Sequence, residues 1–180
     1  MGCLRNLEGK VEYFIAQITD VTPIERELRE RLEFEAFLSD AIADERLIAY
    51  AQPIVDAHTG RVVEEELLVR LVGLDGQVMV PDDFLPQARR FGLMPTIDRF
   101  MVARGIELAR VGRQVAVNLS AQSINDAATI AVITEDLRQA GDAAARVSFE
   151  ITEHAALAST ALAERFSADM RRLGCRLALD

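Results

Sequence analysis

Four strand-like segments each carry one oxygen-bearing side chain on the face opposite their bulky aliphatic residues. These side chains are Glu66 in EEELLVR, Asn118 in VAVNLS, Glu150 in SFEIT and Asp180 in LALD. Successive side chains of a strand point to opposite faces, and in three of the four strands the oxygen-bearing side chain shares its face with a small residue. Carboxylate and amide oxygens are the ligands that Mg²⁺ and Mn²⁺ prefer. No histidine or cysteine belongs to the set, which argues against zinc. The pattern predicts a divalent-metal site if the fold brings these side chains together.

Each of these residues alone also fits an ordinary solvated strand end, and only their repetition in four strands favours a site. Arg70, four residues after Glu66, fits two roles that alternation cannot separate: a salt-bridge partner or an anion-binding group. We expect Glu64 and Glu65 to be solvated, and His58 to lie on the surface in a turn.

From residue 46 onward, apolar strand-like runs alternate with amphipathic helical runs. The strand-like runs are 46–55, 61–72, 113–120, 146–152 and 175–180. The helical runs are 81–92, 95–112, 123–141 and 156–174. The short link DAHTG predicts a hairpin between the first two strands, and the later helices predict parallel crossovers. The sequence therefore predicts an α/β fold whose later strands are buried on both faces. Sites in such folds form at the carboxyl ends of the strands, where three of the four polar side chains lie.

The first 45 residues have a different pattern. Residues 9–20 alternate like a strand, and residues 23–45 have helical spacing with dense charge. Thr22 followed by Pro23 is typical of a helix start. We expect a partly exposed connecting helix, of a kind that also occurs in coiled coils.

Composition excludes several classes. The formal net charge is −9 and no basic block is present, so we expect no nucleic acid polymer as partner. An anionic ligand would need a metal ion or a few placed arginines beside it. No apolar run reaches the roughly 20 residues that span a bilayer, and the start lacks a secretory pattern. We expect a cytoplasmic protein with no membrane segment in this stretch, in which Cys175 is a small core residue.

Several segments together resemble the EAL domain, the cyclic di-GMP phosphodiesterase family. The resemblance runs from about residue 46 to residue 180. It rests on YAQPIVDAHTGRV, EEELLVRL, VPDDFLPQARRFGL, IDRFMV, VAVNLS, FEITE and GCRLALD. A shorter and less specific stretch, residues 9–22, is similar to the closing strands of a PAS sensor domain.

The resemblance implies a TIM-type (βα)8 barrel with one antiparallel strand near its start. Such enzymes hydrolyse cyclic di-GMP to linear pGpG with Mg²⁺ or Mn²⁺. The metal ligands that it implies are the four residues already found by alternation: Glu66, Asn118, Glu150 and Asp180. It also implies substrate contacts from Gln52 and Arg70, and a loop-ordering role for Glu153. The family's Glu-Ala-Leu signature departs at Leu67, which alternation places on the outer face, away from the metal.

The resemblance also implies a division of the chain. Residues 1–22 would end a PAS-like domain, 23–45 would form a linker helix, and 46–180 would form the first, incomplete part of an EAL domain. The family continues with about half a barrel that carries a lysine and the general base. We therefore expect no catalytic base within these residues, and a truncated barrel that is inactive alone.

We expect the parent protein to be a sensor-linked phosphodiesterase and a homodimer. One alternative is a degenerate EAL domain that binds cyclic di-GMP as a receptor without cleaving it. Another is a scaffold that dimerises through residues 23–45.

Overall fold

The computed structural model describes residues 2–5, 10–15, 20–151 and 160–179. The chain divides into two compact units, Met1–Ala36 and Phe37–Asp180. In the first unit, β1 (Gly2–Arg5) pairs antiparallel with β2 (Val11–Ile15). We predicted a strand within 9–20 but not its partner β1. Helix α1 (Thr22–Ala43) confirms the predicted helix.

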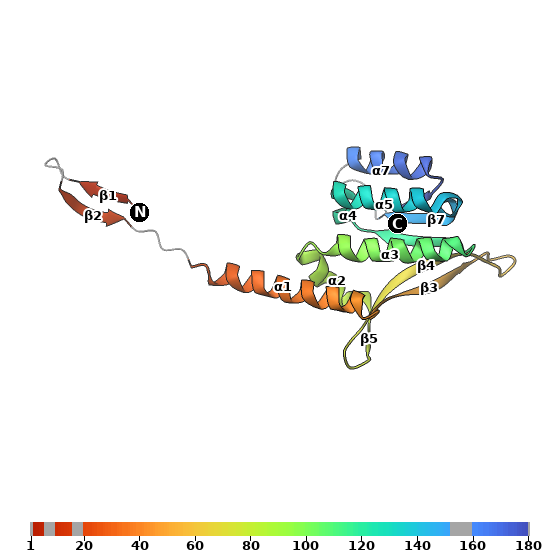
Figure 1. Cartoon of the computed structure of the whole chain (residues 1–180), viewed down its shortest axis with the longest axis horizontal. Coiled ribbons are helices and arrows are strands. Elements are labelled where there is room, and N and C mark those ends of the chain that lie inside the picture. Colours follow the sequence, from red (N-terminus) through yellow and green to blue (C-terminus); the bar gives the residue numbers. More distant parts are fainter. Residues whose placement is uncertain (1, 6–9, 16–19, 152–159, 180) are drawn as a thin grey trace. The chain divides into compact units, whose positions relative to one another are not determined.

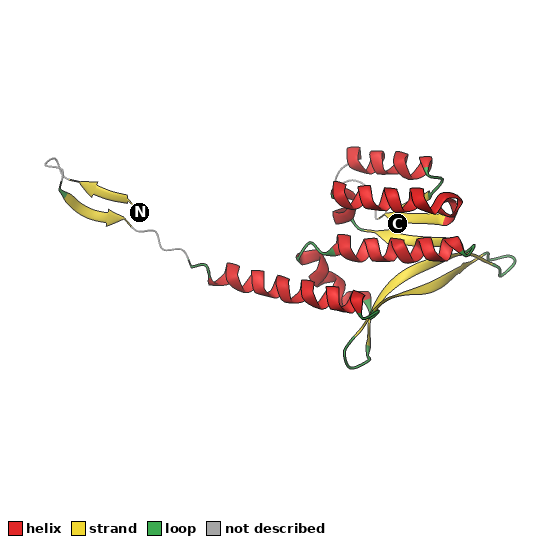
Figure 2. Cartoon of the chain, viewed as in Figure 1, coloured by secondary structure: helices red, strands yellow, loops and turns green. Residues whose placement is uncertain are grey.

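The second unit contains the main sheet of the described residues. Its strands are β3 (Leu47–Val55), β4 (Val62–Val72), β5 (Val78–Met79), β6 (Val115–Leu119), β7 (Val147–Ile151) and β8 (Arg176–Leu179). The order is β3-β4-β6-β7-β8, and β5 pairs with β4. The pair β3–β4 is antiparallel, whereas β4, β6, β7 and β8 run parallel to one another. The predicted α/β class with a mainly parallel sheet is confirmed, and Figure 2 shows its strands. The short β5 was not predicted.

Helices follow the strands as the periodicity predicted, with one exception. They are α2 (Pro81–Arg90), α3 (Met94–Arg110), α4 (Ala121–Asn125), α5 (Ala127–Ala140), the 3-10 turn Gly141–Arg146 and α7 (Thr160–Arg172). The single helix predicted over 123–141 is wrong, because Asp126 interrupts it. Asp126 has an extended backbone, and its carboxylate accepts the Ala128 N–H at 3.1 Å and the Thr129 hydroxyl at 2.6 Å. It therefore ends α4 and caps the start of α5.

One face of the sheet packs against helices, and Figure 1 shows α3, α5 and α7 side by side there. Val115, Val117 and Phe149 are fully buried. The Phe149 ring packs edge-to-face against the Phe166 ring of α7, with the two ring centroids 5.6 Å apart. Strands β6 and β7 are buried as predicted, but β8 is mostly exposed, with Leu179 71% exposed. The prediction that all later strands are buried is therefore wrong for β8, which is an edge strand of the described sheet.

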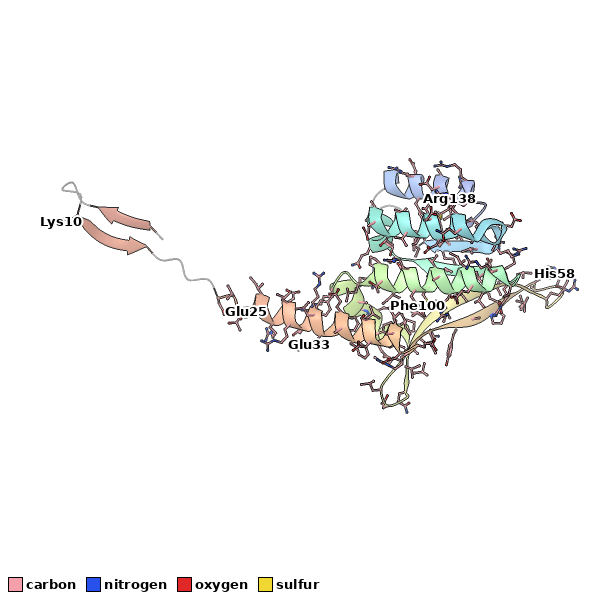
Figure 3. All side chains as sticks on the ribbon, viewed as in Figure 1. Lys10, Glu25, Glu33, His58, Phe100 and Arg138 are labelled. Carbon is pink, nitrogen blue, oxygen red and sulfur yellow. The ribbon has the colours of Figure 1, made fainter. Side chains whose placement is uncertain are left out.

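The hairpin between β3 and β4 is confirmed. Asp56 accepts hydrogen bonds from the His58 and Thr59 amides, and Gly60 has a φ of 66° that suits glycine. His58 is exposed in this turn, as predicted, and Figure 3 labels it there. It lies at the amino end of β4 and so is remote from the strand ends where a site was expected. No helix in the described residues is long and apolar enough to cross a membrane.

Candidate active site

Glu66 and Asn118 lie in contact on the sheet face opposite α3, which we call the polar face. Asn118 Nδ2 donates a hydrogen bond to Glu66 Oε1 at 2.8 Å, across 52 residues of sequence. Strand β4 presents Glu66 toward the polar face while its neighbour Leu67 is 2% exposed on the helix side. The structure therefore has the arrangement that alternation predicted for this pair. The bond occupies one carboxylate oxygen and leaves Glu66 Oε2 and Asn118 Oδ1 available to coordinate a metal ion.

Glu150 lies beside this pair through the strand register. Asn118 of β6 is the cross-strand partner of Glu150 of β7, and Glu66 of β4 is the partner of Ala116, two residues earlier on β6. Asn118 is exposed, and Glu150 is half-buried. Register thus brings three of the predicted metal ligands onto adjacent strands. The fourth, Asp180, and the predicted loop-ordering Glu153 lie outside the described residues.

The donor set fits a hard divalent cation. Among the described residues, no three His, Cys, Asp or Glu side chains are grouped closely enough to hold a metal. Glu66 and Glu150 are two carboxylates, and the third member of the set within that part of the chain is the amide Asn118. Oxygen donors from two carboxylates and an amide are the chemistry that Mg²⁺ and Mn²⁺ bind. These residues therefore fit the ion as a partial ligand set.

Arg70 and Gln52 lie on the same face as Glu66. Gln52 is the cross-strand partner of Glu66 and is exposed. The Arg70 guanidinium lies 5.4 Å from the centre of the Tyr50 ring and donates to the Val69 carbonyl at 2.8 Å. Within the described part of the chain no carboxylate pairs with Arg70. Of the two roles that the sequence left open, this geometry favours an anion-binding group over a salt-bridge partner.

Glu64 and Glu65 are not freely solvated, so that expectation is wrong. Glu65 turns to the helix side, where Arg113 binds both of its oxygens at 2.5 Å. These bonds lower the Glu65 pKa below its ordinary value. Glu64 remains on the polar face and accepts hydrogen bonds from Ser148 and Arg176. Charged partners on both faces explain how β4 accommodates consecutive glutamates.

Asp98 is a buried carboxylate that the sequence interpretation missed. It is 4% exposed, and its Oδ2 accepts the Ser120 N–H at 2.9 Å and the Ser123 hydroxyl at 2.6 Å. Burial raises its pKa in spite of these bonds. Asp98 thereby ties α3 to the turn that follows Asn118. The signal was present in the sequence, because Asp98 lies among the apolar residues of α3 at helical spacing.

A cavity of about 270 Å³ lies beside these groups. Its polar lining comes from Asp98, Asn118, Ser120, Glu150 and Arg89. Its apolar lining comes from β4, from Leu119 of β6 and from helices α2 and α3. Two of the candidate ligands, Asn118 and Glu150, therefore border a partly apolar hollow with a mixed polar rim, as small-molecule sites commonly do.

Comparison with known proteins identifies the family. The family model described as EAL domain matches residues 35–180. The chain belongs to the EAL domain family. The match of this EAL domain begins inside α1, ahead of the first strand of the main sheet.

Relatives of this EAL domain include proteins named as cyclic di-GMP phosphodiesterases. It is 28% identical over 163 residues to Cyclic di-GMP phosphodiesterase PdeF of Escherichia coli, covering 87% of this chain and 22% of that protein. It is 29% identical over 158 residues to Cyclic di-GMP phosphodiesterase NbdA of Pseudomonas aeruginosa, covering 84% and 20%. The chain thus spans about a fifth of these curated relatives.

Solved structures of EAL domains share this fold. The FimX EAL domain of Pseudomonas aeruginosa bound to c-di-GMP superposes with a TM-score of 0.73 at 25% identity. The match covers 82% of this chain and 61% of that one. The parallel-dominated sheet and its helices are therefore those of an EAL domain.

Proposed function

We propose that this EAL domain binds cyclic di-GMP and supplies metal ligands of a phosphodiesterase that hydrolyses it to linear pGpG. The observation that carries the proposal is the contact of Glu66 with Asn118, with Glu150 next in register. In this proposal Glu66, Asn118, Glu150 and Asp180 hold Mg²⁺ or Mn²⁺, and Glu153 orders a nearby loop. The bound ion would polarise the phosphoryl group and lower the pKa of bound water.

The chain's own residues would bind and orient the dinucleotide. Arg70, which no described carboxylate neutralises, would bind a phosphate, and Gln52 would contact the substrate from the neighbouring strand. The Asn118 amide would hold the Glu66 carboxylate in one orientation through the 2.8 Å hydrogen bond. Arg70 and the bound ion would locally offset the net charge of −9, which would otherwise oppose binding of an anionic nucleotide.

We propose further that the barrel is of the TIM type and that these residues alone do not hydrolyse cyclic di-GMP. Among these residues the resemblance implies metal ligands and substrate contacts, and the proposal assigns no lysine or general base to them. In the parent protein, residues 1–22 would end a PAS-like sensor, 23–45 would link it to the EAL domain, and the assembly would be a homodimer in the cytoplasm.

Hydrolysis by the full-length protein tests this proposal. Cyclic di-GMP turnover to pGpG is measured by chromatography with Mg²⁺ or Mn²⁺, for the unaltered protein, Glu66→Gln and the control Glu65→Gln. We expect Glu66→Gln to lose at least about a hundredfold in turnover, because a ligand is lost. The control, on the opposite face of the same strand, keeps most of it.

A receptor is the alternative that the same protein samples distinguish. Tight binding of cyclic di-GMP without hydrolysis would establish a receptor and refute the enzyme. Equal turnover by Glu66→Gln and the unaltered protein would refute the proposed site itself.

A further inference from the structure

A second cluster of polar side chains lies on the polar face, toward the amino ends of the strands. Ser148 Oγ donates to Glu64 Oε1 at 2.6 Å, and Arg176 Nη2 donates to the same oxygen at 2.9 Å. Arg176 Nη2 also donates to Gln114 Oε1 at 3.2 Å. We call these four residues, Glu64, Gln114, Ser148 and Arg176, the polar layer. It connects β4, β7 and β8 with the residue that precedes β6.

On β4 and β7, a residue of the polar layer lies directly upstream of a candidate ligand. Glu64 precedes Glu66 by two residues on β4, and Ser148 precedes Glu150 by two residues on β7. Because side chains alternate with a period of two, Glu64 shares its face with Glu66, and Ser148 shares its face with Glu150. A displacement of Glu64 or Ser148 along or across the sheet is therefore transmitted to the adjacent ligand through one intervening residue.

The Glu64–Ser148 bond passes over an entire strand. Strands lie roughly 4.8 Å apart, so β4 and β7, which flank β6, are separated by about twice that distance. Ala116 lies on β6 between them as the cross-strand partner of both Glu66 and Ser148. Its methyl group leaves room for the Glu64 carboxylate to reach the Ser148 hydroxyl. The bond thus links β4 directly to β7. Without it, the distance between these two strands is set only by the backbone pairings of β4 with β6 and of β6 with β7.

Burial makes this contact costly to break. Ser148 is 5% exposed, and the Glu64 side chain is 18% exposed. A buried hydroxyl that donates to a carboxylate makes a strong, charge-assisted hydrogen bond, and losing its acceptor leaves the hydroxyl unsatisfied. Arg176 is more exposed, at 54% of its side chain, so its ion pair is the weaker part of the layer.

We propose that Glu64 and Ser148 are positioning residues, which set the spacing of β4 and β7 across β6 and thereby the approach of Glu66 to Asn118 and Glu150. The proposal rests on the proposed metal-binding role of those three residues and extends it to a layer that touches neither metal nor substrate. The neighbouring pair Glu65–Arg113 serves stability alone, since it lies on the opposite face.

Mn²⁺ binding to the full-length protein, followed by electron paramagnetic resonance titration, tests the proposal. The variants are Glu64→Ala and the matched control Glu65→Ala, each of which removes a partly buried, ion-paired glutamate from β4. Residues that orient metal ligands typically contribute about 10- to 100-fold to metal affinity. We expect Glu64→Ala to weaken Mn²⁺ binding by at least about tenfold. We expect Glu65→Ala to lower the melting temperature while leaving the Mn²⁺ dissociation constant unchanged.

A conservative variant separates positioning from general destabilisation. Glu64→Gln keeps an oxygen that can accept from Ser148, so it should recover most of the affinity lost in Glu64→Ala. If Glu64→Ala fails to fold, Ser148→Ala removes the same hydrogen bond with a smaller change of volume, and it should also weaken Mn²⁺ binding.

The outcomes distinguish this proposal from the proposed function. If Glu64→Ala binds Mn²⁺ as tightly as the control Glu65→Ala, the positioning role is overturned while the metal site stands. The same holds for Ser148→Ala where it replaces Glu64→Ala. Mn²⁺ binding that is unaffected by Glu66→Gln would refute the proposed function, and the positioning role with it.

Discussion

Replacement of Leu67 by alanine would create the family's Glu-Ala-Leu signature, yet we predict that it destabilises this protein. Leu67 is 2% exposed and lies on the helix side of β4. A methyl group built on Gly105 of α3 would lie 3.6 Å from its Cδ1. Glycine at that point of the helix thus leaves space that the leucine side chain partly fills. The two residues are complementary, and alanine at position 67 would leave a cavity beneath α3.

The magnitude follows from the carbon atoms removed. Three buried carbons at about 0.8 kcal/mol each give roughly 2.4 kcal/mol of lost transfer free energy. The unfilled cavity adds to this, so we expect a loss of about 3 kcal/mol in the free energy of unfolding. In a chain of this size that corresponds to a fall of roughly 6–12 °C in melting temperature.

Urea unfolding followed by circular dichroism measures the loss, and Leu74→Ala is the control. Leu74 lies in the turn after β4 and is 85% exposed, so its truncation should cost less than about 0.5 kcal/mol. A loss below about 1 kcal/mol for Leu67→Ala would contradict the packing of Leu67 beneath α3. Mn²⁺ affinity should stay unchanged, because Leu67 faces away from Glu66; a large fall in affinity would refute the assignment of faces.

Three further predictions concern buried or closely packed groups. Gly105→Ala should lower the free energy of unfolding by about 1 kcal/mol, measured by urea titration. Its new Cβ would lie 2.9 Å from Val117 Cγ2, and this overpacking outweighs the gain in helix propensity. A variant that is more stable than the unaltered protein would contradict this. The Asp98 pKa is raised by burial, so its ionisation opposes folding above its ordinary pKa and ceases to do so as the pH falls. The stability of Asp98→Asn relative to the unaltered protein should therefore rise as the pH increases from 4 to 8, and a flat difference would refute the assignment. The Glu65 pKa is lowered by its bonds to Arg113, so its contribution is present above the ordinary carboxyl pKa and is lost as the pH falls through the lowered value. Glu65→Gln should abolish that part of the acid-induced loss in melting temperature, and an unchanged acid profile would count against the pair.

Much of the fold could be predicted from the sequence because it depends on local patterns. Period-two alternation located β4, β6 and β7, and glycine-terminated helical periodicity located α3. The break between α4 and α5 was not predicted, because the apolar spacing continues through Asp126. The Asp126 side chain nevertheless caps the second helix. Whether an aspartate within a periodic run continues a helix or caps a new one depends on its backbone conformation, which the periodicity does not record.

The candidate site was predictable only in part. Alternation identified the face of Glu66, Asn118 and Glu150, but not the distances between their side chains. The role of Asp98 depends on the Ser120 and Ser123 groups, which lie 22 and 25 residues further along the chain. A buried carboxylate can be inferred from its apolar neighbours, whereas its hydrogen-bond donors follow from the packing of α3 against the β6–α4 turn.

The three consecutive glutamates of β4 are identical in residue type but differ in their partners, and therefore in their roles. Alternation alone separates Glu65, which pairs with Arg113 on the helix side, from its two neighbours. It cannot separate Glu64 from Glu66, because both lie on the polar face. Their surroundings differ through register: Glu66 reaches the Asn118 amide near the carboxyl ends of the strands, and Glu64 reaches a buried hydroxyl and an arginine toward the amino ends. A carboxylate held by a cationic partner is already neutralised, whereas Glu66 is held by a neutral amide. The arrangement therefore leaves its charge for a cation, and it is this difference in partners, more than the motif, that assigns the metal site to Glu66 in our proposal.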